Sequence, residues 1–216
     1  MAQIRSVMAE APAPRAHLVG ADQSRSATLA GLYDNESSGG AAQVVLTRRS
    51  RHMRSHAGEV SFPGGRQEPG EDLWTTALRE AQEEIALDPA AVAHLGELDH
   101  LQTVSSRSWI VPFVAEIAQP HLVIPRLEAS PTEVELILHV GLDELLADGS
   151  FREELWTFGP HTRPVFFFEI EGLTVWGATA AMLRNLLAIA TDTHDPLAEL
   201  SHWDAPGAVL PPGLGE

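Results

Sequence analysis

Residues 61–88 read SFPGGRQEPGEDLWTTALREAQEEIALD and join a glycine pair, a turn rich in Pro and Gly, and a predicted helix without a gap. At 3.6 residues per turn, Glu80, Glu83 and Glu84 fall within an arc of about 100° on one side of that helix. The neighbouring arc carries apolar residues at the spacing of a face packed on a core, namely Trp74, Ala77, Leu78, Ala81 and Ile85. The sequence therefore predicts a helix anchored by one face, with an acidic face that looks outward or into a cleft.

The clustered carboxylates indicate a metal site. Like charges three and four positions apart on a helix repel each other by a few tenths of a kcal/mol, so we expect a cation to offset them. Oxygen-only ligands suit Mg²⁺ or Mn²⁺. The alternative is a solvated acidic face with an Arg79–Glu83 ion pair. The presence of Gly64 and Gly65 favours the interpretation as a metal site over that of a solvated face. Glycine permits backbone conformations closed to other residues and so lets a main-chain carbonyl approach the same ion. Glu71, near the helix start, can brace Arg79.

The spacing of these residues resembles the Nudix box, G-x5-E-x7-R-E-U-x-E-E-x-G-U, in which U is a bulky aliphatic residue. Gly65, Glu71 and the run from Arg79 to Leu87 supply every charged position of that motif. Two positions depart from it: Ala81 stands at the first U, and Ala86 replaces the glycine. That glycine would take the left-handed conformation just past the helix, which costs another residue about 1 kcal/mol. We therefore expect the helix to run on slightly through Ala86, with no ligand lost.

A second signature lies immediately upstream. The residues VLTRRS at 45–50, Arg54, Gly58 and FPGG at 62–65 resemble the motif L-L-T-x-R-[SA]-x3-R-x3-G-x3-F-P-G-G of the coenzyme A pyrophosphatase branch of the Nudix hydrolases. Only the first Leu differs, being Val45. Agreement at so many fixed spacings between Val45 and Leu87 is very improbable by chance.

Composition bounds the function. The 216 residues suffice for one domain, and the absence of Cys and Lys excludes disulfides, thiolate catalysis, Schiff bases and a P-loop lysine. A formal net charge of -16 argues against nucleic-acid binding. No apolar run has the length of a membrane span, and no secretory signal is evident, so we expect a cytoplasmic protein without a membrane partner. The oligomeric state stays open between a monomer and a homodimer.

Arginines beside the acidic helix complete a candidate phosphate site. A protein this acidic repels a polyphosphate unless cations reverse the sign of the charge locally. Five of the 14 basic residues, all Arg, lie within 19 positions: they are Arg48, Arg49, Arg51, Arg54 and Arg66. We expect Arg48, Arg49, Arg54 and Arg66 to bind substrate phosphates. The alternative is that they are surface charges.

The remaining pattern predicts strands at 26–33, 42–48, 60–62, 95–103, 110–117, 132–140 and 163–171, with helices at 141–147 and, after residues 173–176, at 178–190. Residues 1–23 are expected to form a mobile arm, 24–192 the catalytic domain, and 193–216 a poorly ordered tail. In the segment 106–109, SRSW, the sequence departs from the turn that precedes the V-x-P strand of the coenzyme A branch. Trp109 is either a stacking surface for an adenine or a core residue. Glu133 is either an additional carboxylate or general base at the metal, or an exposed strand charge.

Strands alternating with two substantial helices indicate an α/β/α sandwich around a mixed β-sheet, and the resemblance implies the Nudix fold. It also implies a hydrolase of diphosphate linkages whose substrate is coenzyme A or an acyl-CoA, cleaved to 3′,5′-ADP and (acyl-)phosphopantetheine. In that interpretation Glu80, Glu83, Glu84 and the Gly64 carbonyl hold Mg²⁺ or Mn²⁺. Glu84 or Glu80 activates water, and Arg79 positions the carboxylates through Glu71. The alternatives are an enzyme for another nucleotide diphosphate, such as a nucleotide sugar or a dinucleotide, and a non-catalytic nucleotide sensor.

Overall fold

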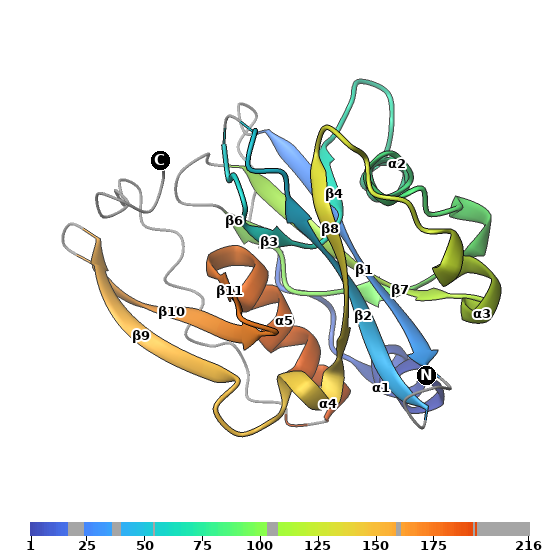
Figure 1. The fold of residues 1–216 in the computed structure, drawn as a ribbon. Helices are drawn as coiled ribbons and strands as arrows, with labels where there is room; N and C mark the ends of the chain where they lie inside the picture. Colours follow the sequence, from blue (N-terminus) through green and yellow to red (C-terminus); the bar gives the residue numbers. More distant parts are fainter. Residues whose placement is uncertain are drawn as a thin grey trace.

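A mixed β-sheet with helices on both faces forms the body of the protein (Figure 1). The computed structural model describes residues 1–16, 24–35, 40–53, 55–102, 108–158, 161–191 and 193. Within them, the central sheet has the order β3-β2-β1-β7-β5, with β4 paired to β1, β6 to β7 and β8 to β2. Its strands are β1 (Arg25–Asn35), β2 (Ala41–Arg49), β3 (Val60–Ser61), β4 (Gly64–Arg66), β5 (Val92–Glu97), β6 (Leu101–Gln102), β7 (Trp109–Ile117) and β8 (Val134–Gly141). The pair β1·β7 is parallel, and the pairs that β1 forms with β2 and β4 are antiparallel, so the sheet is mixed.

Alternation along the strands sends side chains to two separate cores. On β2, Val44 and Leu46 enter a core shared with α5 (Gly177–Ala190), whereas Val45 enters a core shared with α2 (Leu73–Ile85). The two helices lie on opposite sides of the sheet in Figure 1. The structure therefore confirms the predicted α/β/α sandwich.

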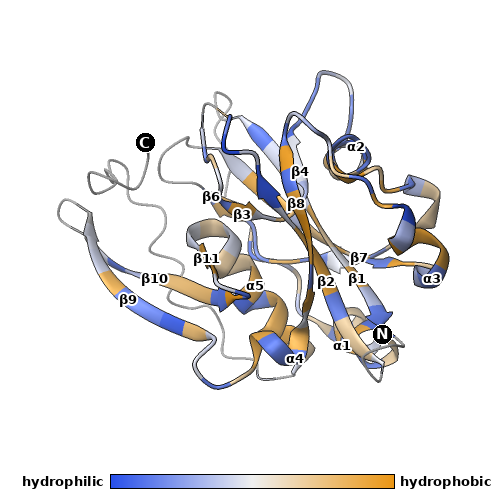
Figure 2. Ribbon diagram, in the orientation of Figure 1, coloured by the Kyte–Doolittle hydropathy of each residue, from blue (hydrophilic) through white to orange (hydrophobic). Residues whose placement is uncertain are grey.

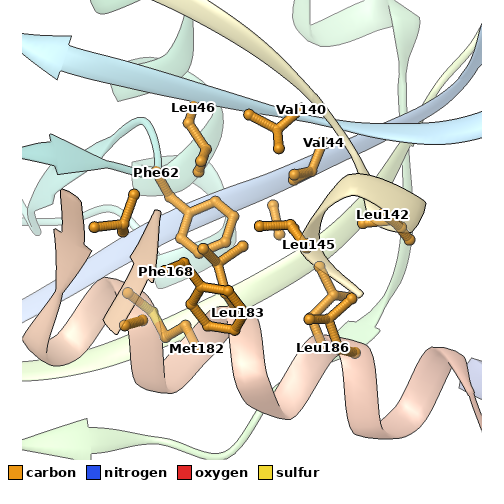
Figure 3. Packing of buried hydrophobic residues seen from close by; sticks show 14 of the residues in the cluster. Val44, Leu46, Phe62, Val140, Leu142, Leu145, Phe168, Met182, Leu183 and Leu186 are labelled. Atoms are coloured by element: carbon orange, nitrogen blue, oxygen red, sulfur yellow. The ribbon is translucent and has the colours of Figure 1, made fainter. Parts of the chain in front are cut away.

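The cluster of buried apolar side chains on the α5 side is the larger of the two. Phe62, Phe168 and Leu183 meet at its centre (Figure 3). A second sheet of order β11-β10-β9 extends this layer, formed by β9 (Phe151–Phe158), β10 (His161–Ile170) and β11 (Leu173–Trp176). Short helices close the connections: α3 (Pro120–Val123), α4 (Leu142–Leu145), and the 3₁₀ turns Pro89–Ala91 and Ile124–Arg126. In Figure 2, α5 is coloured hydrophobic over much of its length, as expected of a helix packed into this core.

The end of α2 differs from the expectation that the helix runs on. The helix begins after Asp72, whose carboxylate accepts the Thr75 amide at 2.8 Å, and it ends at Ile85. Ala86 adopts the left-handed conformation, with φ 55° and ψ 28°, and its amide bonds back to the Gln82 carbonyl. Leu87 follows and is buried in the α2-side core. Burial of Leu87 therefore turns the chain at Ala86 despite the missing glycine.

Part of the N-terminal arm expected at residues 1–23 is helical. Residues Ala2–Glu10 form α1, whose Ile4 and Met8 are buried in the core on the α5 side. Val7 also packs against this core, and Arg5 forms an ion pair with Glu116 at 3.2 Å. The predicted tail, apart from Thr193, lies outside the described residues. In the part of the chain that the structure describes, none of the helices has the length and apolar composition that a membrane span requires.

Candidate active site

The glycine pair connects the two layers at the edge of the site. Phe62 is buried in the α5-side core, and the Pro63 carbonyl accepts the Leu29 amide of β1 at 2.9 Å. Gly64 and Gly65 then pair with β1 as strand β4 and lead toward α2. Phe62 thus acts as an anchor that fixes the position of the two glycines beneath the acidic helix.

Close approach, and not an unusual backbone conformation, is what requires glycine at both positions. Neither Gly64 nor Gly65 has a positive φ, contrary to the expectation from sequence. A Cβ atom on Gly64 would lie 2.4 Å from the Ala27 carbonyl oxygen. One on Gly65 would lie 2.4 Å from the carboxyl carbon of Glu80. Gly64 thus allows the strand to pack on β1, and Gly65 makes room for a candidate metal ligand.

Arg79 is the centre of a dense polar network. Its Nε and Nη2 donate to the two carboxylate oxygens of Glu71 at 3.2 and 3.0 Å, and Nη2 also donates to the Arg66 carbonyl. Its Nη1 lies 2.9 Å from Glu80 Oε1 and 3.0 Å from Glu83 Oε2. The guanidinium therefore holds three of the predicted acidic residues and one backbone carbonyl in a fixed relation.

Glu71 is held from several sides. Besides Arg79, its Oε1 accepts the Glu68 amide and the Thr76 hydroxyl, both at 2.8 Å. The Arg79 hydrogen bonds and the Glu68 amide lower the pKa of Glu71 to about 2. Glu71 is therefore ionised across the neutral range and keeps Arg79 in place.

The three helical carboxylates share a side of α2 but have different environments. Glu84 is buried, with its side chain 4% exposed, whereas the side chain of Glu83 is 59% exposed and turned to Arg79. Desolvation by burial is the main cause that raises the pKa of Glu84 to about 7; the Arg49 charge opposes it, and the charges of Glu80 and Glu133 act in the same direction as burial. Desolvation likewise raises the pKa of Glu80, with the Arg79 charge opposing it.

Two arginines at the end of β2 form ion pairs with different glutamates. The register of β2 against β8 shifts between Arg48 and Arg49, and such a bulge re-aims side chains. Arg49 Nη1 lies 3.6 Å from Glu84 Oε1. Arg48 Nε lies 3.7 Å from a carboxylate oxygen of Glu135, which Arg51 also approaches at 3.6 Å. Nothing in the sequence pattern marks Glu135, because the pairing of β2 with β8 is what brings it to these arginines.

Glu133 lies beside the site. The Ser130 amide donates to the Glu84 carbonyl at 2.8 Å and the Ser50 amide to the Glu133 carbonyl at 2.7 Å, so the segment before β8 bridges α2 and β2. The Glu133 side chain is exposed, and its negative charge raises the pKa values of Glu80 and Glu84. The structure thus brings Glu133 near the helical carboxylates.

The other residues predicted to bind substrate lie in different environments. Arg66 has an exposed side chain at the edge of the site, and Arg54 lies outside the described residues. Trp109 is 3% exposed and packs in the α2-side core, with its ring edge-on to His100. It cannot offer a face to an adenine in this conformation, so the interpretation of Trp109 as a stacking surface is wrong and the core alternative holds.

The donors of the site fit a hard divalent cation in their chemistry. They are carboxylate oxygens, and the two most buried of them have raised pKa values that a nearby cation would lower. Across the described residues, no three acidic or histidine side chains already converge at metal-ligand spacing, because Glu83 is turned to Arg79. Both Glu80 and Glu83 contact Arg79 Nη1 in this arrangement.

Comparison with known proteins agrees with the motif. The family model described as the NUDIX domain matches residues 23–158. The chain is 35% identical over 144 residues to an uncharacterized Nudix hydrolase NudL of Photorhabdus laumondii, covering 66% of this chain and 74% of that protein. It is 34% identical over 166 residues to Nudix hydrolase 3 of Caenorhabditis elegans, covering 69% and 68%.

Solved structures are more distant. A MutT protein from Methanosarcina mazei aligns with a TM-score of 0.49 at 18% identity, over 82% of this chain and all of that one, and such a score carries no argument about function. The family model spans more than half of the chain, and its motif residues are assembled around α2. The chain therefore belongs to the Nudix family of pyrophosphohydrolase enzymes.

Proposed function

We propose that this enzyme hydrolyses the diphosphate linkage of coenzyme A or an acyl-CoA, giving 3′,5′-ADP and phosphopantetheine or its acyl derivative. The observation that carries the proposal is the ion pair between Arg49 and Glu84, at 3.6 Å. It joins the upstream motif that resembles the coenzyme A branch to the acidic helix of the Nudix box. The same upstream motif also meets the helix through the Gly64 amide, which donates to Glu84 Oε2 at 3.4 Å.

The proposed cofactor is Mg²⁺ or Mn²⁺, held by Glu80, Glu83, Glu84 and the Gly64 carbonyl. A divalent ion in this position supplies charge neutralisation for the phosphoanhydride oxygens and makes water more acidic. Glu71 holds Arg79, and Arg79 positions Glu80 and Glu83. These contacts keep the carboxylates arranged on one side of α2.

The arginines bind the substrate in this proposal. Arg48 and Arg49 project from the end of β2, Arg66 follows the glycine pair, and Arg54 belongs to the same motif in the sequence. Guanidinium groups bind phosphates through two parallel hydrogen bonds, so they orient as well as attract the substrate. They also reverse the sign of the charge locally in a protein of formal net charge -16.

The general base is one of two carboxylates. The candidates are Glu84 and Glu80, which lie one helical turn apart on α2. Glu84→Gln and Glu80→Gln separate the roles. Because both residues are also proposed metal ligands, each variant should bind Mn²⁺ more weakly, and the comparison is made at saturating Mn²⁺. There the variant that lacks the base should lose about 10³-fold in kcat, and the variant that lacks only a ligand should lose less. Glu133→Gln, measured in the same way, shows whether this neighbour contributes to either role.

Release of 3′,5′-ADP from coenzyme A tests the proposal directly. The purified enzyme with Mg²⁺ or Mn²⁺ is incubated with coenzyme A and the products are identified by mass. We expect metal-dependent formation of 3′,5′-ADP and phosphopantetheine. The absence of both products with either metal, beside an active control enzyme, would contradict the proposed substrate.

Two alternatives have their own tests. A panel of nucleotide sugars and dinucleotides, ranked by kcat/KM against coenzyme A, identifies another diphosphate substrate. A nucleotide sensor would keep its ligand response when Glu83→Gln damages metal binding, whereas an enzyme loses turnover.

We also propose that the catalytic domain extends over residues 24–192, beyond the segment that the family model matches. The support is α5, since this helix covers one face of the central sheet although it lies after residue 158. The proposal includes a cytoplasmic location, as the sequence predicts.

A further inference from the structure

Two arginines face the acidic side of α2, and they are bound very differently. Arg79 contacts Glu71, Glu80, Glu83 and the Arg66 carbonyl, all within 3.2 Å. Every nitrogen of its guanidinium has a partner in this network. Arg79 is therefore a fixed part of the site and has no group left to serve Glu84.

Arg49 is the counter-charge of Glu84, and its contact is loose. The two charged groups approach only to 3.6 Å, longer than a hydrogen bond, and within the described residues the buried Nε of Arg49 has no hydrogen-bond partner. The other contact of the Glu84 carboxylate, from the Gly64 amide, is also long at 3.4 Å. A buried carboxylate needs a positive partner, yet this one holds its partner weakly.

From this contrast we propose that Arg49 is an exchangeable counter-ion: its guanidinium neutralises Glu84 before the divalent cation binds, and moves to a substrate phosphate once the cation has taken its place. The inference rests on the proposed function, since it needs both a metal at Glu84 and an anionic substrate. No bond is formed or broken in the exchange. Only the partner of Arg49 changes, from a carboxylate to a phosphate.

The exchange couples the two binding events. The cation and Arg49 compete for the same carboxylate, so Arg49 weakens metal binding to the free enzyme. Once released, Arg49 strengthens binding of the anion, and by linkage the anion then strengthens binding of the metal by the same factor. The enzyme thus acquires a substrate-binding cation only when its metal is in place.

Isothermal titration with Mn²⁺, without substrate, tests the competition. Arg49→Gln should bind Mn²⁺ about 5-fold or more tightly than the wild type, the lower end of typical coupling factors. Arg48→Gln is the matched control, because Arg48 lies next to Arg49 on β2 and is similarly buried but contacts Glu135. It should change Mn²⁺ affinity by no more than about 2-fold.

The second half of the exchange is tested with methylenediphosphonate, a diphosphate analogue that is not hydrolysed. With saturating Mn²⁺, Arg49→Gln should bind the analogue at least about 10-fold more weakly than the wild type, as expected for a lost charged contact. In EDTA the two proteins should bind it equally, because Arg49 then stays with Glu84. If Arg49→Gln fails to fold, Glu84→Gln replaces it, and this variant should bind the analogue in EDTA more tightly than the wild type.

The outcomes are distinguishable. A wild-type protein that binds no Mn²⁺ would overturn the proposed metal site and the exchange with it. A wild type that binds Mn²⁺ while Arg49→Gln binds it equally or more weakly would overturn the exchange alone. A difference between the two proteins in analogue binding that is the same in EDTA and in Mn²⁺ would show that Arg49 is a permanent phosphate ligand, which also overturns it.

Discussion

The two faces of the central sheet are built on different principles. On the α5 face, apolar side chains such as Leu183 and Phe168 fill a continuous core, and α5 ends at a relaxed residue, Thr191, with φ -97°. On the α2 face, a smaller core carries the buried acid Glu84 and a left-handed alanine, Ala86. The difference indicates that the α5 face provides most of the folding stability. On the α2 face, the buried charge of Glu84 and the strained backbone of Ala86 lower the stability but build the candidate site.

Truncating the α5 face should have the largest effect on stability. Leu183 is 0% exposed, and Leu183→Ala leaves a cavity that lowers the free energy of unfolding by about 4 kcal/mol. Urea denaturation measures this loss. Mn²⁺ affinity of the folded variant should stay within about 2-fold of the wild type, because a central sheet separates Leu183 from Glu84. A large loss of affinity would mean that the two faces are not independent.

Removing the buried charge of the α2 face should act in the opposite direction. The folded-state pKa of Glu84, about 7, lies above the ordinary value of 4.5. The folded protein thus binds this proton more tightly, and the wild type loses stability as pH rises between these two values. In EDTA, Glu84→Gln should equal the wild type below pH 4.5 and exceed it by about 3 kcal/mol above pH 7.

Urea denaturation of both proteins at pH 4.5, 6 and 8 measures this difference. The variant must be compared in EDTA, because a bound cation would stabilise the wild type and hide the effect. A variant that is less stable than the wild type at pH 8 would show that the carboxylate of Glu84 contributes net stability through Arg49, and the contrast between the faces would then fail.

The sequence predicted the α5 face and the charged motif well, for a physical reason. A 3.6-residue period identified both long helices, and the fixed spacing from Gly65 to Glu84 lies within one continuous segment, so local geometry brings most of it together. The Arg79–Glu71 contact follows from that segment alone. Strand β8 was predicted at 132–140 and runs over Val134–Gly141.

The features that could not be predicted from the sequence depend on contacts between segments that are distant in the chain. Glu135 meets Arg48 through the pairing of β2 with β8, and burial of Trp109 follows from where β7 lies in the sheet. Strand β9 was not predicted, since FREELWTF has two adjacent glutamates in a partly exposed element. The predicted strand at 95–103 is instead divided between β5 and β6. In each case tertiary pairing decides the outcome.

Within the α2 face, Gly64 and Gly65 should respond differently to the same substitution by alanine. Gly64→Ala would bring a Cβ atom to 2.4 Å from the Ala27 carbonyl and 2.7 Å from the Thr28 Cα, both backbone atoms that cannot yield. It should cost about 2 kcal/mol of stability. At Gly65 the three atoms nearest to an added Cβ all belong to the carboxylate of Glu80, the end of a flexible side chain. Gly65→Ala should therefore cost less than about 1 kcal/mol while lowering Mn²⁺ affinity about 10-fold.

Thermal unfolding in EDTA and titration with Mn²⁺ measure the two effects separately for each variant. The pair serves as its own control, because the same methyl group is added at adjacent positions. Equal stability losses in both variants would show that the carboxylate of Glu80 is held as rigidly as the backbone. Gly64 could then not be assigned to backbone packing and Gly65 to the candidate metal site.

The smallest expected effect concerns the end of α2. Ala86 has φ 55°, a conformation that costs a residue with a Cβ about 1 kcal/mol and costs glycine very little. Ala86→Gly should therefore stabilise the protein by about 1 kcal/mol, which corresponds to a rise in Tm of about 2–4 °C for a chain of this size. Calorimetry in EDTA measures the shift.

The matched position on the other face is Thr191, where φ is -97° and the side-chain hydroxyl donates to the Leu187 carbonyl at 2.8 Å. Thr191→Gly should lower Tm, because glycine there only adds freedom to the unfolded chain and removes a hydrogen bond. If both glycine variants lower Tm, the strain at Ala86 is relieved by the burial of Leu87, and the end of α2 is as well adapted as the end of α5.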